Sequence, residues 1–216
     1  MHRTHLINAA ACVLSAGLLA GCATSPSPRE LDAQATAMIK ASFRDQGIAR
    51  VDRLNQDLGQ SACSSDHAPD AETAKKIEAA ALAAIPKPAD GKYLGDWQKG
   101  EKLAQSGRGM TWSDPSAATS ANGGNCYNCH QLSRQEISYG TIGPSLYNYG
   151  KLRGVKDPAD PASAAIVTYT WGKLWNSKAY AACSNMPRFG HAKLLDEAQL
   201  KDLMALLLDP KSPVNQ

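Results

Sequence analysis

The sequence has few aromatic residues: 2 Phe, 7 Tyr and 4 Trp among 216 residues. Its ordinary charged and apolar fractions, 20% and 43%, are nevertheless those of a globular chain that can bury one or two small cores. A large flat cofactor would complete a core that has so few aromatic side chains. The composition therefore favours a domain built around such a group.

Several other patterns are missing. No strand-like alternation of useful length and no internal repeat with a period of about 20 to 50 residues stand out. The net charge is only +3, and no long block of Lys and Arg occurs. These absences argue against a β-rich fold, a solenoid and a nucleic-acid partner.

The N-terminus predicts export. Residues 1–21 read as a signal peptide, with positive residues ahead of an apolar run that ends in Leu19-Ala20-Gly21-Cys22. This ending resembles the bacterial lipobox, in which the cysteine carries the lipid, so we expect a periplasmic protein that is anchored through Cys22. The alternative is ordinary cleavage near Ala20 to Ala23, which would give a soluble periplasmic product. No later apolar run is long enough, at about 20 residues, to cross a membrane.

The rest of the chain predicts an all-α fold with long loops. Residues 22–29 have the Ser/Pro composition of a linker, residues 30–89 form a helical N-terminal extension, and residues 90–216 form the second domain. Loops as long as those of the second domain are improbable unless they wrap around something. Apolar spacing and helix-end signals predict helices over Glu30 to about Leu58, Ala71–Ile85, Trp97–Gln105 and Leu195–Leu208.

The motif Cys126-Tyr-Asn-Cys129-His130 has three possible chemistries. Structural zinc needs four ligands, and the chain has neither a second CxxC nor a nearby His pair. A thioredoxin-type redox pair belongs in a βαβ context, which is missing. Covalent haem c fits best, because the two thiols reach the two vinyl groups and the adjacent imidazole of His130 comes up beneath the iron.

A haem iron on His130 needs a sixth ligand or an open face. Met186 in Ser-Asn-Met-Pro-Arg-Phe-Gly is our candidate, since Pro187 and Gly190 mark a tight loop and a thioether suits an electron carrier. Core packing of Met186 is the alternative, and His191 and His67 are the rival ligands. Four methionines fit less well, because each lies in the signal peptide, far upstream, before the motif or in an amphipathic helix: Met1, Met38, Met110 and Met204.

Two further features belong to the predicted haem pocket. The carbonyl of Pro144, in Thr141-Ile-Gly-Pro-Ser-Leu146, could accept a hydrogen bond from the second nitrogen of His130 and fix the ring. Otherwise Pro144 only stiffens a loop. Four aromatic residues are candidate apolar walls or ordinary packing residues: Tyr147, Tyr149, Trp171 and Trp175.

Two cysteines remain once Cys12 leaves with the signal, Cys22 carries lipid and the motif pair carries haem. They are Cys63 and Cys183, and in an oxidising compartment they predict a disulfide. This bridge would tie the N-terminal extension to the loop that holds Met186. We read both cysteines as structural.

Basic residues near the predicted sixth ligand have two interpretations. Lys173, Lys178 and Arg188 form either a docking patch for a partner or an ordinary solvated surface.

From about Ala71 onward, the chain resembles class I cytochrome c. The general motifs are CYNCH, IGPSL and NMPRFG. Longer phrases resemble the SoxX family, the small cytochrome subunit of the sulfur-oxidising SoxAX complex: ADGKYLGDWQKGEKLAQSGRG, NCYNCHQLSRQEISYGTIGPSLYNYGKLRG and LLLDPKSPVN. The resemblance implies a class I cytochrome c-like domain with one covalent haem c. The extension from Glu30 to Ala68 lies outside the family pattern.

The SoxX resemblance also implies partners. The complex acts as an L-cysteine S-thiosulfotransferase that joins thiosulfate to a cysteine of the SoxY carrier protein. A SoxA-type cytochrome subunit holds the catalytic haem, and this chain would pass the released electrons to a downstream cytochrome. No catalytic nucleophile is identified in this chain. Two alternatives are a stand-alone lipid-tethered carrier serving a terminal oxidase or reductase, and an enzyme that uses an open haem.

Overall fold

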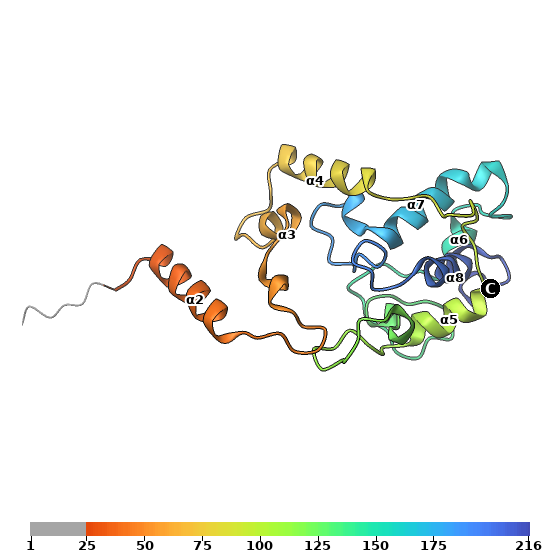
Figure 1. Cartoon of the computed structure of the whole chain (residues 1–216). Coiled ribbons are helices and arrows are strands. Elements are labelled where there is room, and N and C mark those ends of the chain that lie inside the picture. Colours follow the sequence, from red (N-terminus) through yellow and green to blue (C-terminus); the bar gives the residue numbers. More distant parts are fainter. Residues whose placement is uncertain (1–24) are drawn as a thin grey trace, which may run out of the picture. The chain divides into compact units, whose positions relative to one another are not determined.

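The computed structural model describes residues 25–216, so the predicted signal peptide and Cys22 lie outside the described residues. The described residues fall into two units, residues 25–44 and Asp45–Gln216. The first contains α2, Pro28–Ser42, drawn in orange-red in Figure 1. Ser27 caps this helix by accepting a hydrogen bond from the backbone of Glu30, whose side chain accepts one from Ser27 in return.

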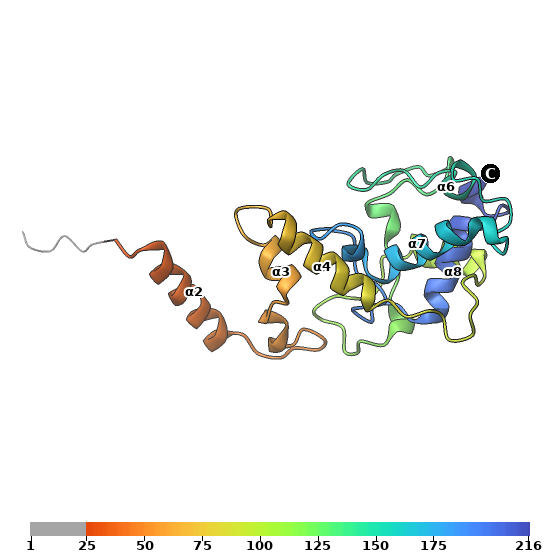
Figure 2. The same ribbon diagram turned by 90° about the horizontal axis from the view of Figure 1, so that it is seen from above.

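The second unit is built from helices and long loops, which Figure 1 and Figure 2 show from two directions. Between residues 25 and 216 the structure has no strand, only one isolated bridge between Gln46 and Ala49, and the all-α prediction is confirmed. None of the described helices has the length and apolar character to cross a membrane. The α-helices are α3 (Leu58–Cys63), α4 (Ala71–Ala83), α5 (Trp97–Gln105), α6 (Tyr149–Leu152), α7 (Ala164–Trp175) and α8 (Glu197–Leu208). The 3-10 helices are η1 (Val51–Leu54), η2 (Thr119–Ala121), η3 (Cys126–Asn128), η4 (Pro161–Ser163), η5 (Ser177–Ala179) and η6 (Pro213–Asn215).

Helices α5 and α8 form the centre of the core. They approach closely at Gly100, where a side chain would clash with the backbone of Asp202. Helix α8 starts at the capping residue Asp196, which exchanges hydrogen bonds with Gln199. Its leucines are almost completely buried, and Leu200 and Leu208 are 0% exposed. Burial of this apolar face stabilises the pair of helices that frames the site.

The C-terminal tail joins α8 to α6. The side-chain amide of Asn215 donates to the carbonyl of Leu207 (3.1 Å) at the end of α8, and its oxygen accepts from Gly150 N (2.9 Å) and Lys151 N (3.1 Å) in α6. Ser212 Oγ donates to the carbonyl of Leu206 at 2.6 Å. These two side chains bond to backbone groups that have no partner within their own helix. Ser212 and Asn215 therefore hold the tail against the ends of α6 and α8.

The segment before α5 is part of the second unit. The predicted disulfide is confirmed: Cys63 at the end of α3 is bonded to Cys183. Helix α4 packs beside η5, and Trp171 Nε1 in α7 donates to the carbonyl of Pro86 at 2.8 Å. Because of these contacts the compact unit begins at Asp45, whereas the sequence placed the boundary between residues 89 and 90.

Two helix predictions differ from the structure. The helix expected from Glu30 to about Leu58 ends at Ser42, because Phe43 is extended and Gly47 turns the chain with φ 53°. Helix α7 was not predicted, since its sequence AAIVTYTWGKLW is rich in β-branched and aromatic residues, which have modest helix propensity. The other predicted helices are present, and α5 has the predicted bounds.

Candidate functional site

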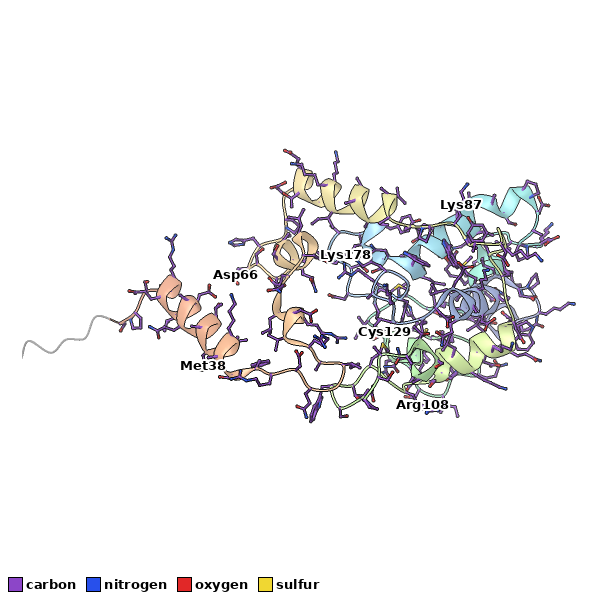
Figure 3. All side chains as sticks on the ribbon, in the orientation of Figure 1. Met38, Asp66, Lys87, Arg108, Cys129 and Lys178 are labelled. Atoms are coloured by element: carbon purple, nitrogen blue, oxygen red, sulfur yellow. A yellow bond between two sulfur atoms is a disulfide. The ribbon has the colours of Figure 1, made fainter. Side chains whose placement is uncertain are left out.

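A cavity of about 600 Å³ lies inside the second unit. Its walls come from the CxxCH motif, from the loop before α6, from α7 and α8, and from the loop before α8. All five predicted cofactor-binding residues line it: Cys126, Cys129, His130, Pro144 and Met186. Figure 3 labels Cys129 on the loop between α5 and α6. The volume is in the range of about 300 to 1,000 Å³ that is usual for cofactor pockets.

Backbone hydrogen bonds fold the CxxCH motif into a tight turn. Asn125 precedes it in the left-handed region with φ 51°, and η3 follows. The carbonyl of Cys126 accepts from Cys129 N (3.1 Å) and His130 N (2.9 Å). The turn therefore brings both thiols and the imidazole to the same cavity.

The loop that contains Pro144 holds the His130 ring. His130 Nδ1 lies 2.6 Å from the Pro144 carbonyl oxygen, so the hydrogen bond expected from the sequence is present. A carbonyl can only accept, which makes Nδ1 the protonated nitrogen and leaves Nε2 free to bind a metal. Gly143 lies against the ring so closely that any side chain there would clash with it. Its backbone amide donates to the carbonyl of Cys129 at 2.8 Å.

Met186 lies on a loop that is fastened by side chains. Its carbonyl accepts from the buried hydroxyl of Ser177 at 2.6 Å, and its amide donates to Ser184 Oγ at 3.3 Å. The Cys63–Cys183 disulfide ties down the loop before it. Arg188 follows it and pairs with Asp57 at 2.9 Å. The Met186 side chain is half-buried against the core.

The structure changes the choice among rival ligands. His191 and His67 are exposed and do not line the cavity. Met204 is fully buried in α8 and does not line it either. Met110, which the sequence gave little weight, does line the cavity, and its backbone is in the left-handed region with φ 60°. Two methionines, Met110 and Met186, therefore line the cavity.

Of the four aromatic residues expected in the walls, only Tyr149 lines the cavity. Trp171 packs in the core against Tyr93, with ring centroids 5.6 Å apart, and Trp175 covers Gly190. Tyr147 is half-buried elsewhere. Sequence reasoning missed Tyr169 and Arg153, and it named Lys173 only as a surface residue and not as part of the cavity wall. The helical period of α7 would have placed Tyr169 and Lys173 on one face, had the helix been recognised.

The charges around the cavity are positive. Arg153 and Lys173 line it, and among the described residues no aspartate or glutamate does. The Arg153 guanidinium lies 3.7 Å from the centre of the Tyr149 ring, a cation–π contact. Burial lowers the pKa of Lys173. Burial also raises the pKa of the Cys126 thiol to about 12, and the neighbouring Cys129 adds to the rise, so the Cys126 thiol meets the apolar cavity as a neutral group.

The basic residues near Met186 match neither of the two interpretations drawn from the sequence, a docking patch or a solvated surface. Lys178 is only 9% exposed, and Lys173 is half-buried beside the cavity. The Arg188 side chain is 20% exposed and is paired with Asp57. These three side chains are packed within the fold, so they form neither an open docking patch nor a freely solvated surface.

The donor set fits haem better than its rivals. In residues 25–216 no three His, Cys, Asp or Glu side chains are gathered as a metal site, so a structural zinc ion would lack its ligands there. The motif lies in a 3-10 turn rather than between a strand and a helix, unlike a thioredoxin pair. Two thiols, an oriented imidazole and a thioether on an apolar cavity fit covalent haem c.

Comparisons with known proteins agree with this site. Residues 116–209 match the family model for cytochrome c. The chain is 32% identical over 215 residues to an "Uncharacterized lipoprotein" of Aquifex aeolicus (strain VF5), a match that covers 95% of this chain and 97% of the relative. Residues 116–209 therefore form a domain of the cytochrome c family, whose members carry covalently bound haem c.

Proposed function

We propose that this protein is an electron-transfer cytochrome with one haem c, held by Cys126 and Cys129 and ligated by His130 and Met186. The observation that carries this proposal is that all four residues line one cavity. When bound, the haem supplies a one-electron couple between ferric and ferrous iron. A single CxxCH motif in the sequence supports one haem per chain.

The protein's own residues would tune this couple. The Pro144 carbonyl fixes the tautomer and orientation of His130 through the 2.6 Å hydrogen bond, which raises the basicity of the ligating nitrogen. The Met186 thioether is a neutral, soft ligand that favours the ferrous state. Buried leucines of α8, such as Leu203 and Leu206, line the same cavity and exclude water from it. This arrangement suits electron relay without substrate binding at the iron.

For the biological role, we propose a subunit of a SoxAX-type complex in thiosulfate oxidation. The support is the sequence resemblance around the motif and in the tail, whose Asn215 and Ser212 hold α6 and α8. In this role a SoxA-type partner carries out the chemistry on the SoxY cysteine, and this chain receives the electrons. The L-cysteine S-thiosulfotransferase activity then belongs to the complex.

The second candidate is a stand-alone lipid-tethered carrier that serves a terminal oxidase or reductase. The name of the Aquifex aeolicus relative, a lipoprotein, favours a tether, and the Leu-Ala-Gly-Cys22 sequence of this chain agrees with it. Both candidates place the haem domain in the periplasm. They differ in their partner, since an obligate subunit should bury about 1,600 Å² or more with its companion.

Gentle isolation from the native host would separate the two candidates. The companions that co-purify are resolved by electrophoresis and stained for covalent haem. A stoichiometric second cytochrome, together with haem reduction by thiosulfate plus its carrier protein, is the result expected for the SoxAX role. Recovery of a lone cytochrome that these reagents do not reduce would contradict it and favour the tethered carrier.

A further inference from the structure

The two sulfurs of the Cys63–Cys183 disulfide have unequal surroundings. Cys183 is exposed, whereas Cys63 is half-buried. The ammonium nitrogen of Lys178, which is labelled in Figure 3, lies 4.0 Å from Sγ of Cys63. Cys183 therefore lies at the surface, whereas Sγ of Cys63 has a cation beside it.

Lys178 is an unusual neighbour because it is 9% exposed and lacks a carboxylate partner. The charge of Asp57 acts on Lys178, but the two oxygens of Asp57 already accept from Gln60 N (2.6 Å) and Arg188 Nη1 (2.9 Å). Within the described part of the chain Lys178 forms no ion pair within 4.0 Å. Burial lowers the pKa of Lys178, Arg188 adds to the fall and Asp57 opposes it. A negative charge beside this buried cation would be stabilised.

We propose that the Cys63–Cys183 bridge is a thiol–disulfide exchange site in which Cys183 is the attacked sulfur and Cys63 is the leaving group. A thiolate forms a bond to Sγ of Cys183 as the bond to Cys63 breaks. The electron pair of that bond leaves with Cys63, which becomes a thiolate beside the ammonium of Lys178. A leaving thiol with a stabilised thiolate leaves faster.

Two neighbouring groups act against negative charge at Cys63. The Ala182 carbonyl oxygen lies 3.4 Å from its Sγ, and the Glu78 carboxylate accepts from the Ala182 amide at 3.1 Å. Lys178 is the cation in contact with the sulfur, so it decides which cysteine departs.

The co-reactant is a thiol or, for complete reduction, a dithiol. With a dithiol, the second thiolate of the reagent attacks the reagent's own sulfur in the mixed disulfide. The bond to Cys183 breaks, and Cys183 leaves as a thiolate. Two electrons then pass to the Cys63–Cys183 pair, the dithiol becomes a disulfide, and its two protons balance the two new thiolates. The exchange uses no haem ligand as a reactant, although it opens the bridge that fastens the loop carrying Met186.

The test uses the full holoprotein with glutathione as the probe thiol. Samples are quenched with acid at intervals, free thiols are alkylated, and peptides are identified by mass spectrometry. The expected product has glutathione on Cys183 and a free, alkylated Cys63. Lys178→Met should slow the exchange about fivefold, while Lys178→Arg should keep most of the rate. Lys99→Met, at an exposed position on α5, is the control with the same change in net charge.

Three results would overturn the proposal. They are glutathione mainly on Cys63, a Lys178→Met rate equal to that of wild type, and a wild-type bridge that reacts only after the protein unfolds. Haem absorption and thermal unfolding of each variant are measured alongside, and a Lys178→Met variant that has lost its fold is replaced by Lys178→Gln. Because exchange is read at the sulfurs, its failure would leave the electron-transfer function unaffected.

Discussion

The wall of the cavity around His130 and the wall around Met186 are built by different means. Around His130, backbone groups of neighbouring segments bond to one another, as in the contact of Gly143 N with the Cys129 carbonyl at 2.8 Å. Around Met186, the loop is fastened by distant residues, through the disulfide to Cys63 and the ion pair with Asp57. The first wall is local in sequence, and the second depends on contacts across 120 residues or more.

This difference suggests that the two walls respond differently to mutation. A change far upstream, in α3, should weaken the Met186 wall and leave the imidazole in place. A change in the loop at residues 140–144 should disturb the imidazole directly. The N-terminal part of the second unit thus holds the loop that carries Met186.

Removing the disulfide should have the largest effect. We expect the Cys63→Ala, Cys183→Ala double variant to lose about 2 to 4 kcal/mol of unfolding free energy, since the unfolded chain gains freedom. The covalent haem already restricts the unfolded chain, which favours the lower figure. Denaturant unfolding of the holoprotein, followed by haem absorption and by tryptophan fluorescence, measures this loss. A loss below about 0.5 kcal/mol would mean that the bridge is not what fastens the Met186 loop.

A side chain at Gly143 should break the other wall. Gly143→Ala places a methyl group against the imidazole of His130, and overpacking of this kind costs about 1 to 3 kcal/mol. The yield of holoprotein and its unfolding free energy should both fall. Ile137→Ala, between η3 and α6, is the control, because Ile137 is 99% exposed and does not line the cavity, so its truncation should change stability little. Equal behaviour of the two variants would argue against the close approach of Gly143 to the ring.

The ion pair of Asp57 with Arg188 should have the smallest effect. Burial alone would raise the pKa of Asp57, but hydrogen bonds from the Gln60 amide and from Arg188 outweigh it and lower the pKa. The carboxylate therefore stabilises the fold above its unfolded pKa, and this contribution is lost as the pH falls through its lower folded pKa. Its side chain is 43% exposed, so we expect less than about 1 kcal/mol from the ion pair.

Unfolding measured from neutral to acid pH checks this prediction. Asp57→Asn should be less stable than wild type at neutral pH and should show a weaker loss of stability in acid. Asp52→Asn, in η1, controls for the loss of one carboxylate from the same region. Parallel pH profiles of Asp57→Asn and wild type would contradict the role assigned to Asp57.

Local sequence signals were sufficient to predict the cavity wall around His130 and the helices that frame it. Helix α5 and the start of α8 at Asp196 follow from capping and apolar spacing, and the CxxCH spacing carries its own geometry. The hydrogen bond of His130 with Pro144 could also be anticipated, because Pro144 lies on the loop that follows the CxxCH motif in the sequence.

Tertiary contacts decided what the sequence could not predict. Helix α7 forms although its residues favour strands, because Trp171 and Leu174 are buried in the core. Met110 reaches the cavity through a left-handed backbone that no local signal marks. The burial of Lys178 beside Cys63 depends on the packing of α4 against η5, which no local pattern predicts.

The central claim is that the iron is held between His130 and Met186, and a redox titration of Met186→Ala tests it most directly, with Met110→Ala as the control. We predict that Met186→Ala keeps its covalent haem, that its reduction potential falls by more than about 59 mV, a tenfold change for one electron, and that the ferric protein binds added imidazole. Met110→Ala should keep the wild-type potential. A wild-type potential in Met186→Ala, or a fall in Met110→Ala instead, would contradict the claim.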